Sequence, residues 1–332
     1  MSNRILIVGP SWIGDMVMAQ SLFIAVKQRW PHASIDVLAP KWSRPLLERM
    51  PEVRAAIDLP FAHRQLALKG RYQLAQSLRH RYDQAIVLPN SFKSALIPFW
   101  AKIPIRTGWR GEWRYGLLND IRILDKSAYP KMVERFFALA WPVNEQPKKS
   151  YPYPKLHVNE ANRFKTLTDF GLNTLKPVVI LCPGAEFGPS KQWPASYYAQ
   201  VAQDLIAKGC QIWIMGSNKD RLIASAIQSK ISDCIDLTGR TTLAQAIDLT
   251  SLAKEVITND SGLMHIAAAL DCHIIAIYGS TDPSFTPPLS TKTHIIKSNL
   301  TCSPCFKRTC PYGHHHCMKN IYPEQVLKAS LI

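Results

Sequence analysis

Short apolar runs alternate with amphipathic helical stretches along this chain, and the alternation occurs twice. One series begins at residues 4–9 and a second at residues 177–182. Apolar runs of five or six residues, separated by helical segments, are typical of parallel strands joined by right-handed crossovers. The sequence therefore predicts an α/β protein with two Rossmann-like domains, each binding ligands at the carboxyl ends of its strands.

The individual elements follow from apolar spacing and from turn residues. Strands are expected at residues 4–9, 34–39, 56–59, 84–88, 106–108, 177–182, 211–216, 235–237, 255–258 and 273–279. Helices are expected at residues 15–29, 42–50, 65–80, 91–101, 130–140, 194–208, 219–229, 243–253 and 261–270.

A proline-rich segment separates the two series. Residues 142–157 contain four prolines and few candidates for a core, and proline interrupts both helices and sheet ladders. We therefore predict two domains, 1–150 and 151–332, facing each other across a cleft. Whether the final helix packs back on the first domain stays open at this point.

Positive charge is concentrated in the first half of the chain. The net charge of the 332 residues is +16, and residues 1–150 contribute +12 of it, from 23 Lys and Arg against 11 Asp and Glu. This excess indicates an anionic partner: nucleic acid, a phosphorylated substrate or an anionic membrane face. No apolar run approaches the length of a bilayer span, and the short run at the N-terminus turns at Gly9-Pro10, so we expect a cytoplasmic protein.

The first strand-to-helix loop reads Gly9-Pro-Ser-Trp-Ile-Gly14-Asp15-Met16. Its glycine spacing resembles the start of a P-loop, but Asp15 stands where that motif has a lysine and would repel phosphate. The dinucleotide fingerprint fails as well, because Ser11 replaces its second glycine. Two readings of Asp15 remain: a helix-capping residue, or a general base kept ionised by the helix dipole.

Loops of the second half have the composition of a nucleotide site. After the strand at 177–182 comes a glycine- and proline-rich turn that leads to Lys191, which suits a diphosphate. The strand at 255–258 leads to Asn259-Asp260-Ser261-Gly262 and a helix, whose first N–H groups would form an anion site. His265 lies one turn further, either as a phosphate ligand or as an ordinary surface histidine.

Eight cysteines all lie after residue 180. Four of them stand singly in apolar surroundings and read as core residues, whereas Cys302, Cys305, Cys310 and Cys317 form a cluster with three histidines. The cluster is compatible with a zinc site, although its spacing is not that of a standard finger. The alternative is a packed loop of reduced or redox-active thiols.

Several long runs together resemble glycosyltransferase family 9, the bacterial lipopolysaccharide heptosyltransferases, which have the GT-B fold. The resemblance covers nearly the whole chain, and its runs are residues 9–16, 88–96, 106–111, 114–120, 182–189, 258–265 and 285–289. It implies inverting transfer of L-glycero-D-manno-heptose from ADP-heptose to the first heptose of the inner core, on heptosyl-Kdo2-lipid A. The first domain would then bind the acceptor, and the second would bind the nucleotide-sugar donor.

The resemblance also implies roles for individual residues. Asp15 would be the base that deprotonates the acceptor hydroxyl. Donor contacts would come from Ala185, Glu186, Lys191, Asp220, Thr241, Asp260, Ser261, Gly262, Leu263 and His265. Among the basic residues of the first half, Lys93, Arg106 and Arg110 are the first candidates for acceptor binding, followed by Arg114 and Arg122.

The implied chemistry requires no cofactor. Because Lys191, His265 and a helix N-terminus could stabilise the departing ADP, and no Asp-x-Asp pair stands at a loop, we expect metal-independent catalysis. The expected partners are ADP-heptose, the lipid A acceptor and the anionic inner face of the inner membrane, with no nucleic acid. Two alternatives remain: another nucleotide-sugar transferase of the family, or a basic binding module without catalysis.

Overall fold

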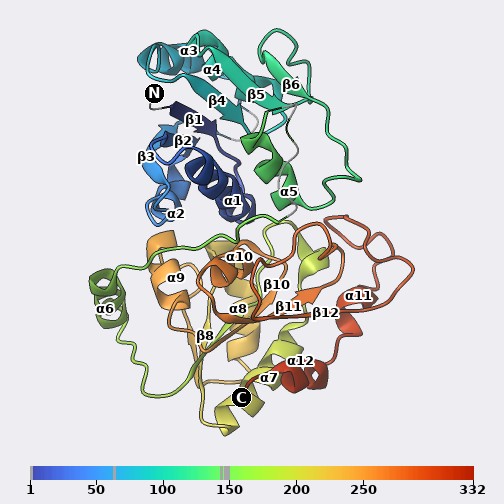
Figure 1. Ribbon diagram of the computed structural model, residues 1–332. Helices are drawn as coiled ribbons and strands as arrows, with labels where there is room; N and C mark the ends of the chain where they lie inside the picture. Colours follow the sequence, from blue (N-terminus) through green and yellow to red (C-terminus); the bar gives the residue numbers. More distant parts are fainter. Residues whose placement is uncertain (1–2, 63–64, 143–144, 146–149) are drawn as a thin grey trace. The chain divides into compact units, whose positions relative to one another are not determined.

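The computed structural model describes residues 3–62, 65–142, 145 and 150–332, and the chain divides into two compact units. The first unit comprises Met1–Pro154 and the second Lys155–Ile332. The division lies inside the predicted proline-rich segment, four residues after the expected boundary. Figure 1 shows a parallel sheet flanked by helices in each unit.

The first unit is built on a six-stranded parallel sheet with the order β3-β2-β1-β4-β5-β6. Its strands are β1 (Arg4–Val8), β2 (Ser34–Pro40), β3 (Val53–Leu59), β4 (Gln84–Val87), β5 (Ile105–Trp109) and β6 (Asp120–Arg122). Its helices are α1 (Ile13–Arg29), α2 (Arg44–Leu47), α3 (Leu68–Ser77), α4 (Phe92–Trp100) and α5 (Met132–Phe137).

The second unit repeats this arrangement. Its sheet order is β12-β11-β10-β7-β8-β9, with β7 (Val178–Cys182), β8 (Gln211–Ile214), β9 (Cys234–Asp236), β10 (Glu255–Asn259), β11 (His273–Tyr278) and β12 (Thr293–Lys297). Its helices are α6 (Glu160–Asp169), α7 (Ala195–Ala207), α8 (Arg221–Gln228), α9 (Leu243–Thr250), α10 (Gly262–Ala269), α11 (His316–Lys319) and α12 (Pro323–Ala329). Numbered within each unit, both sheets have the strand order 3-2-1-4-5-6 of dinucleotide-binding folds.

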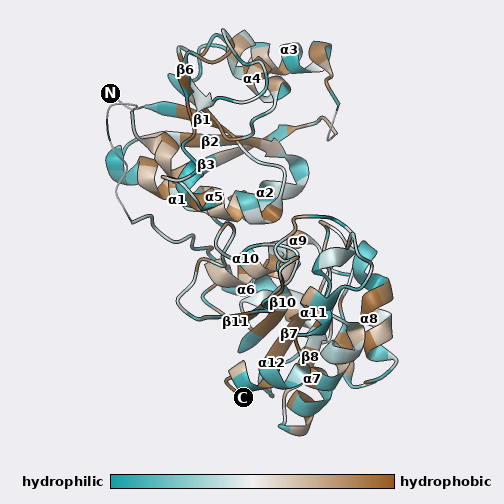
Figure 2. Cartoon of the chain, turned by 90° about the vertical axis from the view of Figure 1, so that its right-hand side faces the viewer, coloured by the Kyte–Doolittle hydropathy of each residue, from teal (hydrophilic) through white to brown (hydrophobic). Residues whose placement is uncertain are grey.

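Apolar strands buried on both faces explain why these segments form parallel sheets. Every residue of β7 and β10 is buried, as are the last four residues of β1. In Figure 2 the strands of both sheets are largely brown, while teal residues lie on the outer sides of many helices. Helices on both faces of a sheet leave its strands no polar side, so continuous apolar runs are required.

The C-terminal helix α12 contributes to the core of the second unit. Val326 of α12 is fully buried in the core of the second unit, among residues of β7, α7 and β8. The apolar face of α12 is therefore covered within its own unit, and packing of this helix on the first domain stays a prediction. Among the described residues, none of the helices has both the length and the apolarity that a membrane crossing requires.

Each sheet has one point where its strand order reverses. In the first unit this point lies between β1 and β4, and in the second between β7 and β10. Loops diverge there at the carboxyl ends of the strands, which leaves room for a ligand. The loop before Asp15 follows β1, and the loops that carry Lys191 and Asp260 follow β7 and β10. The predicted residues therefore lie at the two switch points.

Candidate active site

The junction between β10 and α10 forms the centre of the candidate donor site. Ser261 is the N-cap of α10, and its hydroxyl accepts a hydrogen bond from the amide of Met264 at 3.4 Å. The amides of Gly262 and Leu263 belong to the first turn, where N–H groups have no partner within the helix. Together with the helix dipole, they create an electropositive end that suits a phosphate.

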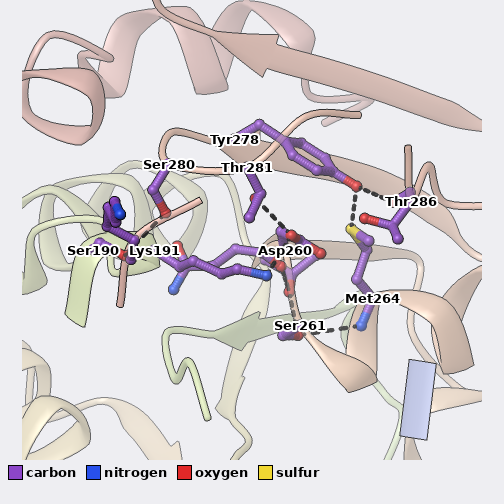
Figure 3. A network of polar contacts seen from close by, with 12 residues as sticks. Ser190, Lys191, Asp260, Ser261, Met264, Tyr278, Ser280, Thr281 and Thr286 are labelled. Carbon is purple, nitrogen blue, oxygen red and sulfur yellow. Dashed lines mark hydrogen bonds and ion pairs between the residues drawn. The ribbon is translucent and has the colours of Figure 1, made fainter. Parts of the chain in front are cut away.

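A compact polar network lies beside this helix end (Figure 3). The Lys191 ammonium lies 2.5 Å from Asp260 Oδ2, and the Thr281 hydroxyl donates to the same oxygen at 2.6 Å. Both charged side chains are largely buried, with 13% of Lys191 and 6% of Asp260 exposed. Because the carboxylate takes two donors, it fixes the ammonium of Lys191 next to the start of α10. Thr281 was not predicted as a site residue, although it follows the carboxyl end of β11, where ligand-binding residues of parallel sheets lie.

His265 is buried within the same site rather than exposed. Only 4% of its surface is accessible, and its Nδ1 is buried without a hydrogen-bond partner among the described residues. Burial lowers the pKa of His265 from 6.5 to about 4; Asp260 opposes this shift and Lys191 adds to it. The reading as an ordinary surface histidine is therefore wrong. Near neutral pH the imidazole is uncharged, so it can meet a phosphate oxygen only by donating its single N–H, without a positive charge.

Asn259 holds the two phosphate-facing loops together. Its Oδ1 accepts hydrogen bonds from the Trp193 amide at 3.2 Å and the Tyr198 hydroxyl at 3.1 Å, and its Nδ2 donates to the Pro183 carbonyl at 2.7 Å. The side chain is fully buried. It therefore connects the end of β10 to both ends of the loop that carries Lys191. Sequence reasoning assigned this residue no separate role, because its partners lie more than 60 positions away.

The segment around the clustered cysteines also supports the loop that carries Lys191. The Ser190 hydroxyl donates to the Lys307 carbonyl at 2.5 Å and lies 3.0 Å from the Ser280 hydroxyl, while the Ser190 amide donates to the Arg308 carbonyl at 3.2 Å. In the part of the chain that the structure describes, no group of three or more Cys, His, Asp or Glu is placed to hold a metal ion. The zinc reading of Cys302, Cys305, Cys310 and Cys317 is therefore not supported.

Three further donor candidates lie on the loops after β7, β8 and β9. The Asp220 carboxylate accepts hydrogen bonds from the Ser217 amide and hydroxyl at 2.7 and 2.8 Å. A Cβ on Gly184 would lie 2.2 Å from Asp220 Cγ, so glycine allows the two loops to approach closely. Glu186 forms an exposed ion pair with Lys219. Thr241, which is half-buried, immediately precedes the N-cap of α9.

Ala185 lies in the same turn as Gly184, and its carbonyl accepts a hydrogen bond from the Gly188 amide at 3.1 Å. The Gly239 amide donates to the Gly216 carbonyl at 2.9 Å, which joins the loops after β8 and β9. The structure therefore brings all the predicted donor residues to one edge of the second sheet.

Asp15 occupies the first turn of α1 in the first unit. The N-cap of this helix is Trp12, and Asp15 is its third residue, so Asp15 does not hold the N-cap position that one reading expected. A carboxylate at that position is stabilised in its ionised form by the helix dipole. Asp15 is half-buried and lies at the carboxyl end of β1. Its place at the switch point of the first sheet is compatible with a general base.

The basic residues of the first unit separate into two groups. Lys93 lies in the first turn of α4, half-buried, and burial lowers its pKa, with Arg71 adding to the shift and Glu112 opposing it. Arg110 directly follows β5 and is exposed. Both residues therefore lie near the carboxyl edge of the first sheet, where an acceptor is expected.

Arg106 does not belong with Lys93 and Arg110. It is the second residue of β5, and its guanidinium donates to the carbonyls of Leu117 and Ile103, both at 2.6 Å. Three further residues of β5 separate it from the carboxyl edge, about 10 Å at the usual rise of a strand. The side chain therefore stabilises the fold, and its role in acceptor binding stays a prediction.

Arg114 and Arg122 are also engaged within the fold. Arg114 is 2% exposed and donates to the Pro89 carbonyl at 2.7 Å, and Arg122 pairs with Asp120 at 2.8 Å. Neither guanidinium is thus available to an acceptor in the way the sequence suggested.

Comparison with known proteins agrees with this geometry. The model of glycosyltransferase family 9 (heptosyltransferase) matches residues 71–316. The chain belongs to glycosyltransferase family 9. A solved structure of the family, ADP-heptose lipopolysaccharide heptosyltransferase II from Escherichia coli, superposes with a TM-score of 0.89, at 46% identity over 98% of this chain and 97% of that one. The predicted α/β class and GT-B architecture are confirmed.

Relatives within family 9 differ in their similarity to the chain. Lipopolysaccharide heptosyltransferase 2 of Salmonella typhimurium is 48% identical over 98% of this chain and 97% of its own length. Lipopolysaccharide heptosyltransferase 1 of Pseudomonas aeruginosa is 24% identical over 93% of this chain and 88% of its own length. The runs at residues 106–111 and 114–120 favour the second kind of heptosyltransferase over the first, and the difference in identity confirms that preference.

Proposed function

We propose that this protein transfers L-glycero-D-manno-heptose from ADP-heptose to the first heptose of the lipopolysaccharide inner core, with inversion at the anomeric carbon. The observation that carries the proposal is the arrangement of Lys191, Asp260 and the start of α10 at the switch point of the second sheet. It occurs in a chain that is 48% identical over its length to a lipopolysaccharide heptosyltransferase 2.

In this mechanism the second unit binds the donor and stabilises the leaving group. ADP gains negative charge as the bond from the sugar to the phosphate breaks. The Lys191 ammonium, the first amides of α10 and a neutral N–H of His265 stabilise that charge, and these groups need no metal ion. Asp220 and Thr241, on the neighbouring loops, contact the ribose and the adenine.

Asp15 acts as the general base. It removes the proton from the acceptor hydroxyl while that oxygen attacks the anomeric carbon from the side opposite to ADP. A direct displacement of this kind needs one base and one stabilised leaving group, and it inverts the anomeric configuration. Lys93 and Arg110 orient the anionic acceptor through its carboxylates and phosphates.

The acceptor is a lipid, so the enzyme works as a peripheral protein at the inner face of the inner membrane. Residues 1–150 carry a net charge of +12, and the first unit exposes Trp113 (83%), Tyr115 (64%) and Ile123 (70%). Cations beside exposed aromatic and aliphatic side chains suit an anionic bilayer surface. Co-sedimentation with vesicles containing phosphatidylglycerol, but not with purely zwitterionic vesicles, tests this part.

Release of ADP from ADP-heptose tests the reaction and separates it from its alternatives. Heptosyl-Kdo2-lipid A should support release, and Kdo2-lipid A without heptose should not. EDTA should leave the rate unchanged. Turnover with ADP-glucose in preference to ADP-heptose would favour another nucleotide-sugar transferase, and absence of turnover with every donor would refute the enzyme.

A further inference from the structure

The four clustered cysteines are free thiols, and the segment that carries them packs against the carboxyl end of β11. The Ser303 hydroxyl donates to the Gly279 carbonyl at 2.6 Å, which holds the stretch with Cys302 and Cys305 against this strand end. A Cβ on Gly279 would lie 3.2 Å from Cys317 Sγ, so the last cysteine of the cluster contacts the same place. Residues that are 15 positions apart in the sequence thus meet at one point of the fold.

Cys317 is the buried member of the cluster. Its side chain belongs to the core of the second unit, and only 8% of its surface is accessible. Burial raises the pKa of the Cys317 thiol, and the charges of Cys305, Cys310 and Cys302 raise it further, in that order. Cys317 therefore lies within electrostatic reach of the three other thiols and stays protonated when they ionise.

Cys310 is the member of the cluster that ionises readily. It is half-buried, and hydrogen bonds from the backbone lower the pKa of its thiol, first that of His315 and then those of residues 312–314, while burial opposes the shift. Residues 299–320 contain three Lys or Arg, three His and no Asp or Glu, so the surroundings are electropositive. A partly exposed thiol that forms its thiolate in such surroundings is the kind that oxidants attack.

The same segment braces the loop that carries Lys191. The Arg308 carbonyl, two residues before Cys310, accepts a hydrogen bond from the Ser190 amide at 3.2 Å. The Arg308 guanidinium lies 5.3 Å from the centre of the Phe187 ring, and the Lys191 ammonium lies 4.9 Å from the same centre. A shift of residues 308–310 would therefore reach Lys191 through the Ser190 amide and the Phe187 ring. Figure 3 shows Ser190 directly beside Lys191.

We propose that Cys310 and Cys317 form an intramolecular disulfide when the protein meets a peroxide, and that this bond weakens nucleotide binding by displacing the segment that braces Lys191. A disulfide brings its two sulfur atoms to about 2.0 Å. Because Cys317 is fixed in the core, the half-buried Cys310 is the residue that moves. The disulfide itself does not depend on the proposed function, whereas its effect on the nucleotide rests on that function.

Hydrogen peroxide supplies the oxidising equivalents. The Cys310 thiolate attacks one peroxide oxygen, the O–O bond breaks, and the other oxygen leaves as hydroxide, which takes up the proton that Cys310 had lost. The Cys317 thiol then attacks the sulfur of the sulfenic acid. The S–S bond forms, the S–O bond breaks, and the oxygen leaves as a second water with the proton of Cys317. Each sulfur loses one electron and each peroxide oxygen gains one.

Peptide mapping of the full chain after peroxide treatment, under non-reducing conditions, tests the disulfide. Wild-type protein should yield peptides joined through Cys310 and Cys317, which dithiothreitol separates. Its affinity for ADP, measured by calorimetry, should fall about tenfold or more after oxidation and recover with dithiothreitol. Cys310→Ser should form no disulfide and keep its affinity for ADP throughout. Cys302→Ser, which removes another half-buried thiol of the cluster, is the matched control and should behave as wild type does.

The outcomes separate this disulfide from the function. A disulfide that joins Cys302 or Cys305 instead, or one that only links two chains, would overturn the assigned pair, as would a zinc ion that protects the four thiols from peroxide. Protein that carries the Cys310–Cys317 bond and binds ADP as before would overturn the effect on the nucleotide. Reduced wild-type protein that does not bind ADP would contradict the proposed function, and the peptide map would still test the disulfide.

Discussion

Protonation of His265 should destabilise the second unit at mildly acidic pH. The imidazole is 4% exposed, and its pKa is lowered from 6.5 to about 4 by burial. In the unfolded chain the same group takes up a proton near pH 6.5. The neutral, buried form therefore contributes stability that is fully present above pH 6.5 and is lost as the pH falls toward 4.

The size of this effect follows from the two pKa values. Between pH 7 and pH 5 the linkage relation predicts a loss of about 2 kcal/mol in the free energy of unfolding from this one group. For a unit of this size that corresponds to a melting temperature lower by roughly 4–8 °C. Other groups also titrate in this range, so the measured quantity is the difference between wild type and His265→Gln, which cannot take up the proton.

Hydrogen exchange followed by mass spectrometry on peptides from β10 and α10 gives the opening free energy locally. The stability advantage of wild type over His265→Gln should shrink by about 2 kcal/mol between pH 7 and pH 5. His32→Gln, at an exposed histidine of the first unit, controls for nonspecific effects and should show no such trend. An advantage that stays constant over these two pH units would refute the burial of a neutral imidazole.

Three further substitutions test individual contacts. Asn259→Leu should destabilise the second unit by about 3 kcal/mol, because it leaves the buried Trp193 amide and Pro183 carbonyl without partners. If this variant melts at the wild-type temperature in a thermal scan, Asn259 does not hold the two loops together. Arg106→Lys should lower the free energy of unfolding by about 1–3 kcal/mol, because the hydrogen bonds to the Leu117 and Ile103 carbonyls are lost. The KM for the acceptor should not change. A raised KM at unchanged stability would instead show that Arg106 binds the acceptor. Lys191→Met should weaken binding of ADP about 10- to 100-fold, whereas Lys230→Met, at an exposed lysine after α8, should not; equal affinities in calorimetry would exclude Lys191 from the donor site.

The architecture was largely readable from the sequence because parallel strands buried on both faces leave a strong local pattern. All ten expected strands are present, with ends shifted by a few residues. The strands β6 and β12 were missed. In β12 only one of five residues is buried, so this edge strand lacks the apolar run on which the predictions relied. The helix α6 and the short helix α11 were also not predicted, and the final helix α12 was expected without defined bounds.

The site was predictable where a residue's role depends on its position at a strand end. Lys191, Asp260 and His265 came together because the carboxyl ends of parallel strands meet at one edge. The place of Arg106 near the start of β5 and its hydrogen bonds to the Leu117 and Ile103 carbonyls could not be predicted, because those partners are not evident in the sequence. Asn259 and Thr281 act through partners that are distant in the sequence, and such contacts appear only in the folded chain.

Heptose transfer by the Asp15→Asn variant tests the central claim most directly. Purified protein is incubated with ADP-heptose and heptosyl-Kdo2-lipid A, and mass spectrometry measures the acceptor carrying one additional heptosyl residue, alongside calorimetry of ADP-heptose binding. Wild type should form this product, and the variant should form it at least about 100-fold more slowly while binding ADP-heptose with nearly unchanged affinity. A variant that transfers heptose at the wild-type rate, or one that loses donor binding instead, would contradict the role of Asp15 as the catalytic base.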